Sequence, residues 1–239
     1  PHRPALGRAD FLVAPANELA VAWIDRWPDW PRTALVLQGP AASGKTHLAQ
    51  VWRRAAGAVS VTPAALIETE PAALLDGARA AFLDDAGAAL AEVEPAASAA
   101  QAAQARGLLH LYNTLDELGG HLLLADRRPP GAWPVALPDL ASRLGAAPVV
   151  PLGAPDDALL AAVLVKLFAD RQLSVAPEVV SFLLPRMERS LAAAREVVAA
   201  LDRAALARQS GITVPLARAV LNAPPEADPE EGRDPWTWD

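Results

Sequence analysis

The sequence predicts an α/β fold, in which a five-stranded parallel sheet carries helices on its faces and a smaller all-helical domain follows. Three observations support this prediction. Short apolar runs alternate with helical patterns over the first 153 residues, as is typical of parallel sheets. A glycine-rich motif stands between one such run and a helix. After Pro155 the strand patterns nearly stop and helical patterns continue.

The predicted strands are short apolar runs bounded by turn or helix signals. Residues 46–55 indicate a helix between the first two strands. A longer helical pattern precedes the fourth strand, and Gly119 with Gly120 ends it. We expect Trp23 and Trp27, four residues apart on a predicted helix with Leu19, to pack against the sheet. The predicted strands span residues 34–38, 58–62, 80–84, 121–125 and 148–152.

The second half of the chain contains two clear helix starts. Asp156 or Asp157 begins a helix with an apolar face, and Ser190 begins another. We therefore expect a nucleotide-binding α/β domain over residues 1–153 and a helical lid domain over residues 154–222. Residues 223–239 combine four prolines with six acidic residues, which predicts a disordered tail.

Composition narrows the function classes. The chain has 239 residues, a formal charge of −7 and no cysteine, so it has neither disulfides nor a thiolate metal site. No signal peptide and no apolar run of ~18 residues appear, which predicts a cytoplasmic protein without membrane contact. The negative charge gives no broad basic surface for DNA, so we expect no direct sequence-specific DNA binding.

The strongest chemical signal is the motif G-x-x-x-x-G-K-[ST], placed after a strand and at the start of a helix. Its glycines let the backbone wrap closely around phosphates, and its N–H groups bind the anion. The lysine reaches the terminal phosphates, and the threonine ligates Mg²⁺. The loop residues expected at the nucleotide are Gly39, Pro40, Ala41, Ala42, Ser43, Gly44, Lys45 and Thr46.

An apolar strand followed by two acids lies about forty residues further on. We expect Asp84 to hold Mg²⁺ through water and Asp85 to polarise an attacking water. A helix cap is the alternative interpretation of this pair. Guanine specificity usually needs an [NT]-K-x-D segment, which the surroundings of Lys166 do not provide. The expected cofactors are therefore ADP or ATP with Mg²⁺.

Three further segments are distinctive: Leu111-Tyr112-Asn113, Asp126-Arg127-Arg128-Pro129-Pro130 and residues 137–144. They resemble the AAA+ module of DnaA, and more closely the DnaA-related regulatory inactivators of the Hda family. Phe11 with Asn17 resembles the opening of the same module. The resemblance spans about residues 10–221. It implies that Asp126 is a sensor at the end of the fourth strand, that Arg143 is an arginine finger for a neighbour's nucleotide, and that Arg195 is a lid sensor. It also places Leu12, Asn17 and His47 at the nucleotide, with no catalytic task for His47.

The resemblance implies partners as well. DnaA is the expected partner, the DNA sliding clamp is expected from the family alone, and a homodimer is one assembly that the family allows. The clamp-docking peptide expected of the family is absent from this chain, which starts at Pro1. Only about seventeen residues follow Asn222, too few for the DNA-binding domain of DnaA, so we do not expect origin recognition.

The function predicted on these grounds is a nucleotide-bound regulator of weak intrinsic ATPase activity. It promotes hydrolysis of DnaA-bound ATP through Arg143 in trans and so restrains initiation of DNA replication. An autonomous AAA+ ATPase that acts as a homo-oligomer, like a helicase loader, is the alternative. A P-loop small-molecule kinase is a third interpretation, which the long helical C-terminal part disfavours.

Overall fold

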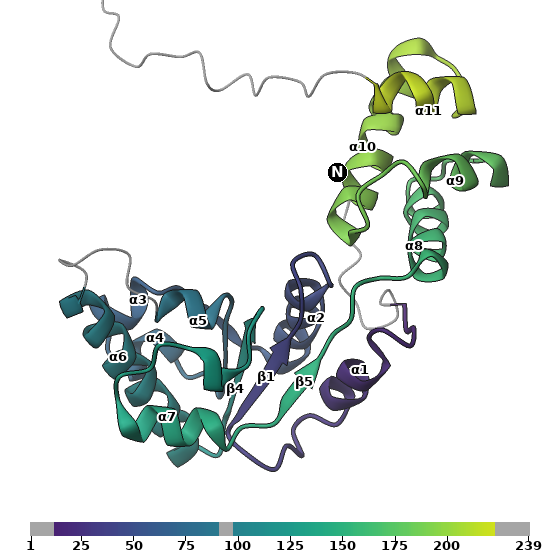
Figure 1. Ribbon diagram of the computed structural model, residues 1–239. Coiled ribbons are helices and arrows are strands. Elements are labelled where there is room, and N and C mark those ends of the chain that lie inside the picture. The colour runs from purple at the N-terminus through teal and green to yellow at the C-terminus, as the bar shows by residue number, and fades with distance from the viewer. Residues whose placement is uncertain (1–11, 91–97, 223–239) are drawn as a thin grey trace, which may run out of the picture. The chain divides into compact units, whose positions relative to one another are not determined.

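The computed structural model describes residues 12–90 and 98–222. These residues divide into two compact units, one ending at Leu159 and one starting at Leu160, inside helix α8 (Asp157–Asp170). Figure 1 shows the sheet and its helices in the first unit and a group of helices in the second. Phe11 and the predicted tail at 223–239 lie outside the described residues.

The first unit contains a five-stranded parallel sheet in the order β2-β3-β4-β1-β5. Strand β1 therefore lies between β4 and β5, and Gln38 at its carboxyl end pairs in register with Asp126. The predicted α/β fold and all five predicted strands are confirmed, with ends shifted by at most one residue. The strands are β1 (Ala34–Gln38), β2 (Val59–Val61), β3 (Ala80–Leu83), β4 (His121–Asp126) and β5 (Val149–Pro151).

The three inner strands, β3, β4 and β1, are buried on both faces and are largely apolar, as expected for a parallel sheet covered by helices. One face packs against α1 (Glu18–Asp25) and α2 (Lys45–Ala56). The opposite face packs against α6 (Ser98–Glu117), α7 (Pro138–Gly145) and shorter helices. Figure 1 shows α1 and α2 on one side of the strands and the other helices opposite. The shorter helices are α3 (Ala65–Glu68), α4 (Pro71–Leu75), α5 (Ala86–Ala89) and the 3-10 helix η3 (Pro130–Ala132).

The tryptophans near the N-terminus form part of the core, as predicted. Trp23 and Trp27 pack against the first of these faces, although α1 ends at Asp25 and Trp27 therefore lies beyond the helix. Leu19 does not share this burial: 53% of its surface is exposed. The ring of Trp30 stacks on that of Trp52 with centroids 5.3 Å apart.

The second unit is a helical core built from α8, α9 (Pro177–Leu183), α10 (Leu191–Arg208) and α11 (Val214–Leu221). The Asp156 carboxylate accepts the Leu159 N–H at 2.7 Å, so Asp156 rather than Asp157 caps α8. The Ser190 hydroxyl oxygen accepts the Ala193 N–H at 3.0 Å, which confirms the predicted start of α10. None of the described helices is long and apolar enough to cross a membrane.

Candidate nucleotide-binding site

The glycine-rich loop joins the carboxyl end of β1 to the first turn of α2. Gly44 occupies the N-cap position of α2 with φ of 100°, a conformation that glycine adopts without steric cost. At Gly39 a Cβ atom would lie 2.3 Å from the Leu152 carbonyl oxygen, so the close approach of loop and β5 requires glycine there. The backbone is therefore shaped for close contact with a phosphate group.

Lys45 is buried inside the loop. Its Nζ donates hydrogen bonds to the carbonyl oxygens of Gly39 at 2.9 Å and Pro40 at 2.8 Å. Burial lowers the pKa of Lys45, and the negative charges of Asp84 and Asp85 oppose that shift. The ammonium group is thus held inside the glycine-rich loop by two of the loop's carbonyl oxygens.

Ser43 further tests whether the loop suits a phosphate-containing ligand. Its hydroxyl is buried and has no hydrogen-bond partner. Buried polar atoms are normally satisfied, and a phosphate oxygen in the loop would supply the missing partner. The residues present therefore suit a phosphate-containing ligand.

Two side chains could hold a magnesium ion at this loop. The Thr46 hydroxyl donates to Asp84 Oδ2 at 2.7 Å, which joins the first turn of α2 to the end of β3. The described residues contain no group of three His, Asp or Glu that could hold a metal by themselves. Mg²⁺ commonly uses one or two protein oxygens and completes its shell with phosphate oxygens and water. Thr46 and Asp84 fit that pattern.

Asp85 follows Asp84 in a left-handed conformation, with φ of 47°. It stands at the N-cap position of α5, yet its side chain makes no capping hydrogen bond. Its own N–H instead donates to Asp84 Oδ1 at 3.1 Å. The carboxylate of Asp85 is exposed, so the helix-cap interpretation does not account for it.

Asp126 is buried at the end of β4, beside the glycine-rich loop. Its Oδ2 accepts the Gly87 N–H at 2.7 Å and its Oδ1 accepts the Arg128 N–H at 2.8 Å. The Gly39 N–H donates to the Asp126 carbonyl oxygen at 3.1 Å. Asp126 therefore connects the loop to the segment after Asp85, a contact that sequence patterns do not reveal.

The other residues expected at the nucleotide belong to three different segments of the chain. Buried Asn17 uses its amide locally: Oδ1 accepts the Ala14 N–H at 2.8 Å, and Nδ2 donates to the Leu12 carbonyl oxygen at 3.0 Å. His47 is half-buried in the first turn of α2. Arg195 is exposed on α10 in the second unit, and its sensor assignment stays a prediction.

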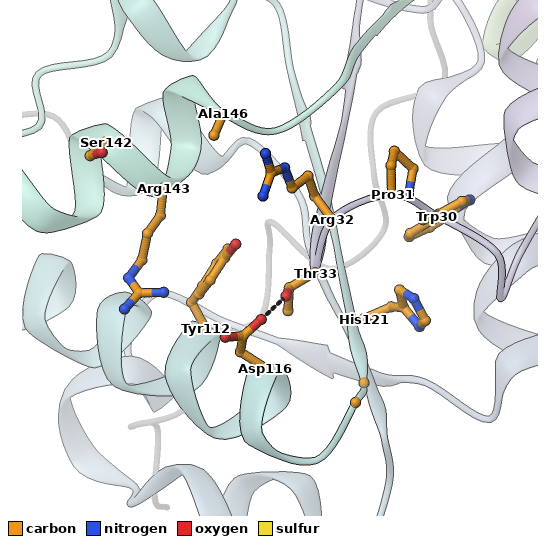
Figure 2. Close-up of a pocket in the computed structure, with 12 residues that line it drawn as sticks. Trp30, Pro31, Arg32, Thr33, Tyr112, Asp116, His121, Ser142, Arg143 and Ala146 are labelled. Carbon is orange, nitrogen blue, oxygen red and sulfur yellow. Dashed lines mark hydrogen bonds between the residues drawn. The ribbon is translucent and has the colours of Figure 1, made fainter.

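Arg143 lies at the opposite end of the sheet from the glycine-rich loop. It projects from α7 into a hollow of about 460 Å³ (Figure 2). That hollow is lined by residues 30–33, which directly precede β1, and by residues 119–121, which lead into the start of β4. The loop follows the other end of β1, which spans about 13 Å at ~3.3 Å per residue. Arg143 therefore faces away from the phosphate loop of its own chain.

Two cations near these sites were not assigned from sequence. Arg127 is exposed directly after Asp126, and its charge contributes to lowering the pKa of Lys45. Arg32 lines the same hollow as Arg143. In the sequence each is simply an arginine next to a predicted strand. Many ordinary surface arginines have the same position, so the pattern does not indicate a site.

A family model for the lid domain of Hda matches residues 157–221. An uncharacterized protein of Haemophilus influenzae is 32% identical over 117 residues, which are 48% of this chain and 50% of that protein. The chain thus spans about half the length of this curated relative.

Solved structures show the same fold at low identity. Domain III of the Thermotoga maritima replication initiation protein DnaA is 17% identical, with a TM-score of 0.74, over 92% of this chain and 97% of that one. AMPPCP-bound DnaA from Aquifex aeolicus is 18% identical, with a TM-score of 0.66, over 84% and 66%. RuvB of Thermotoga maritima is 14% identical, with a TM-score of 0.60, over 86% and 66%. Residues 157–221 thus match the lid domain of Hda, and the chain has the fold of DnaA domain III. These two similarities support a DnaA-related protein of the Hda type.

Proposed function

We propose that this protein is a nucleotide-bound AAA+ regulator that inactivates DnaA by promoting hydrolysis of the ATP bound to DnaA. Arg143 acts as an arginine finger on the nucleotide of the neighbouring DnaA subunit. The observation that carries this proposal is the position of Arg143 at the amino ends of β1 and β4, away from the phosphate loop of its own chain. A cation there serves a neighbour's phosphates.

The ligand of the protein's own loop is ADP or ATP with Mg²⁺. Lys45 holds the terminal phosphates and Thr46 with Asp84 holds the ion. The inward-facing Lys45 ammonium and the unpartnered hydroxyl of Ser43 support this assignment. The DnaA structures of similar fold include AMPPCP-bound ones, which supports an adenine base.

The reaction takes place on the partner. A water oxygen forms a bond to the γ-phosphorus of DnaA-bound ATP, and the bond from that phosphorus to the oxygen bridging the β- and γ-phosphates breaks. ADP leaves with the bridging oxygen, and the proton of the water passes to solvent. An arginine finger stabilises the negative charge of this transition state and contributes roughly 10³–10⁵ in kcat. The protein's own Asp85 supports at most a weak intrinsic ATPase.

The wider assignments rest on the family relationship. DnaA is the proposed partner because the lid matches Hda. Docking on the DNA sliding clamp, a homodimer and a cytoplasmic location are proposed with it.

The test uses DnaA preloaded with labelled ATP on DNA that carries the sliding clamp. Single-turnover hydrolysis is measured while this protein is titrated in. We expect a hydrolysis rate that saturates with the ratio of this protein to DnaA. Hydrolysis that needs no DnaA and rises with the concentration of this protein alone would favour the alternative, an autonomous homo-oligomeric ATPase.

A further inference from the structure

The hollow that contains Arg143 holds a second arginine from a different part of the chain. Arg32 stands two residues before β1, and Arg143 reaches in from α7. Figure 2 shows the two guanidinium groups on either side of the Tyr112 ring. The hollow measures about 460 Å³ and is open to solvent, so a ligand or a neighbouring protein can enter it.

In the described part of the chain, no acidic side chain neutralises the charge of either arginine in the hollow. The Cζ atom of Arg143 lies 5.1 Å from the centroid of the Tyr112 ring, a cation–π contact that orients the guanidinium but leaves its charge in place. Among the residues that the structure describes, neither the Arg32 nor the Arg143 side chain forms an ion pair or a hydrogen bond. Both therefore keep their N–H groups available for an incoming anion.

The other charged and titratable groups of the hollow do not cancel the positive charge of the two arginines. Asp116 accepts a hydrogen bond from the Thr33 hydroxyl, so one of its oxygens is occupied within the hollow's wall. Burial lowers the pKa of His121, so its imidazole is neutral at pH 7. The hollow thus carries two positive charges against one negative charge, in a chain whose formal net charge is −7.

We propose that this hollow is a two-arginine phosphate site, in which Arg32 acts beside Arg143 on the terminal phosphates of a nucleotide bound by the neighbouring subunit. The inference rests on the proposed function and adds a second residue to it. A terminal phosphate carries close to two negative charges, and planar guanidinium groups match its oxygens with paired hydrogen bonds. One arginine balances about half of that negative charge, and the second arginine balances the rest.

The test compares variants of the full chain in the single-turnover assay with ATP-loaded DnaA. Arg32→Ala is expected to lower the saturating hydrolysis rate by at least about tenfold, a smaller loss than removal of a finger. Arg32→Lys is expected to recover part of the rate, because it keeps the charge without the paired geometry. The affinity of each variant for its own ADP, measured by calorimetry, is expected to stay unchanged.

Arg79 provides the matched control. It is an exposed arginine directly before β3, on the same edge of the sheet, but it does not line the hollow. Arg79→Ala is expected to leave the hydrolysis rate unchanged. An equal loss in Arg79→Ala would show a general effect of positive charge on this edge and would overturn the assignment of Arg32.

Three further outcomes separate this inference from the proposed function. If Arg143→Ala loses stimulation while Arg32→Ala keeps the full saturating rate, the finger stands and the two-arginine site is wrong. A change confined to the half-saturating concentration would place Arg32 against an acidic side chain of the partner and would also overturn the phosphate site. If neither variant changes the rate, the proposed function itself fails.

Discussion

Substitution of Asp126 tests directly how the carboxyl end of β4 stabilises the segments around the nucleotide site. The residue is 5% exposed, and its carboxylate accepts two backbone N–H groups, from Gly87 at 2.7 Å and Arg128 at 2.8 Å. In Asp126→Asn the amide keeps one acceptor oxygen and turns an NH₂ group toward the other N–H. One buried N–H then loses its partner, which costs about 1–3 kcal/mol. We expect the free energy of unfolding to fall by about that amount.

The measurement is urea unfolding followed by circular dichroism, together with amide hydrogen exchange at Gly87 and Arg128. Asp76→Asn is the control, because Asp76 is exposed in a left-handed turn that asparagine tolerates, and surface changes usually stay within about 0.5 kcal/mol. Protection of the Gly87 and Arg128 amides is expected to fall only in Asp126→Asn. Unchanged protection and a stability loss no larger than that of the control would refute the structural task given to this carboxylate.

Three other predictions concern the loop, a histidine and a close helix contact. Lys45→Ala is expected to lower ADP affinity at least about tenfold in equilibrium dialysis, because hydrogen bonds to charged groups contribute ~1.5–3 kcal/mol; unchanged affinity would remove Lys45 from the site. Burial lowers the pKa of His121 below its unfolded value, so the unfolded chain binds the proton more readily. Stability should therefore decline as the pH falls below the unfolded pKa, and this decline should be shallower in His121→Phe; parallel pH profiles would contradict it. In Gly107→Ala the new Cβ would lie 1.9 Å from the Leu66 carbonyl oxygen, so α3 and α6 must separate and the melting temperature should drop, whereas Gly131→Ala has open space and should not change it.

The strands of the sheet could be predicted because each is a short apolar run with a clear boundary, and a buried parallel strand needs little else. The loop from Gly39 to Thr46 could be predicted for a similar reason, since its residue types and spacing are dictated by phosphate geometry. Local signals also located the starts of α8 and α10. These features depend on neighbours in sequence.

Contacts between distant segments could not be predicted. The hydrogen bond from Gly87 to Asp126 joins residues 39 positions apart, and the bond from Thr33 to Asp116 joins residues 83 positions apart. Neither pair has a local pattern. Arg32 was missed for the same reason, because an arginine before a strand is ordinary surface until the fold brings α7 beside it.

The measurement that tests the central claim most directly is a paired one on Arg143→Ala. Its affinity for its own ADP and its stimulation of ATP hydrolysis by DnaA are determined on the same preparation. A finger in trans predicts ADP affinity within about twofold of the original protein and at least about a hundredfold loss of stimulation. Loss of the protein's own ADP binding, with full stimulation once the site is refilled at high ADP, would contradict the assignment of Arg143 as a trans-acting finger.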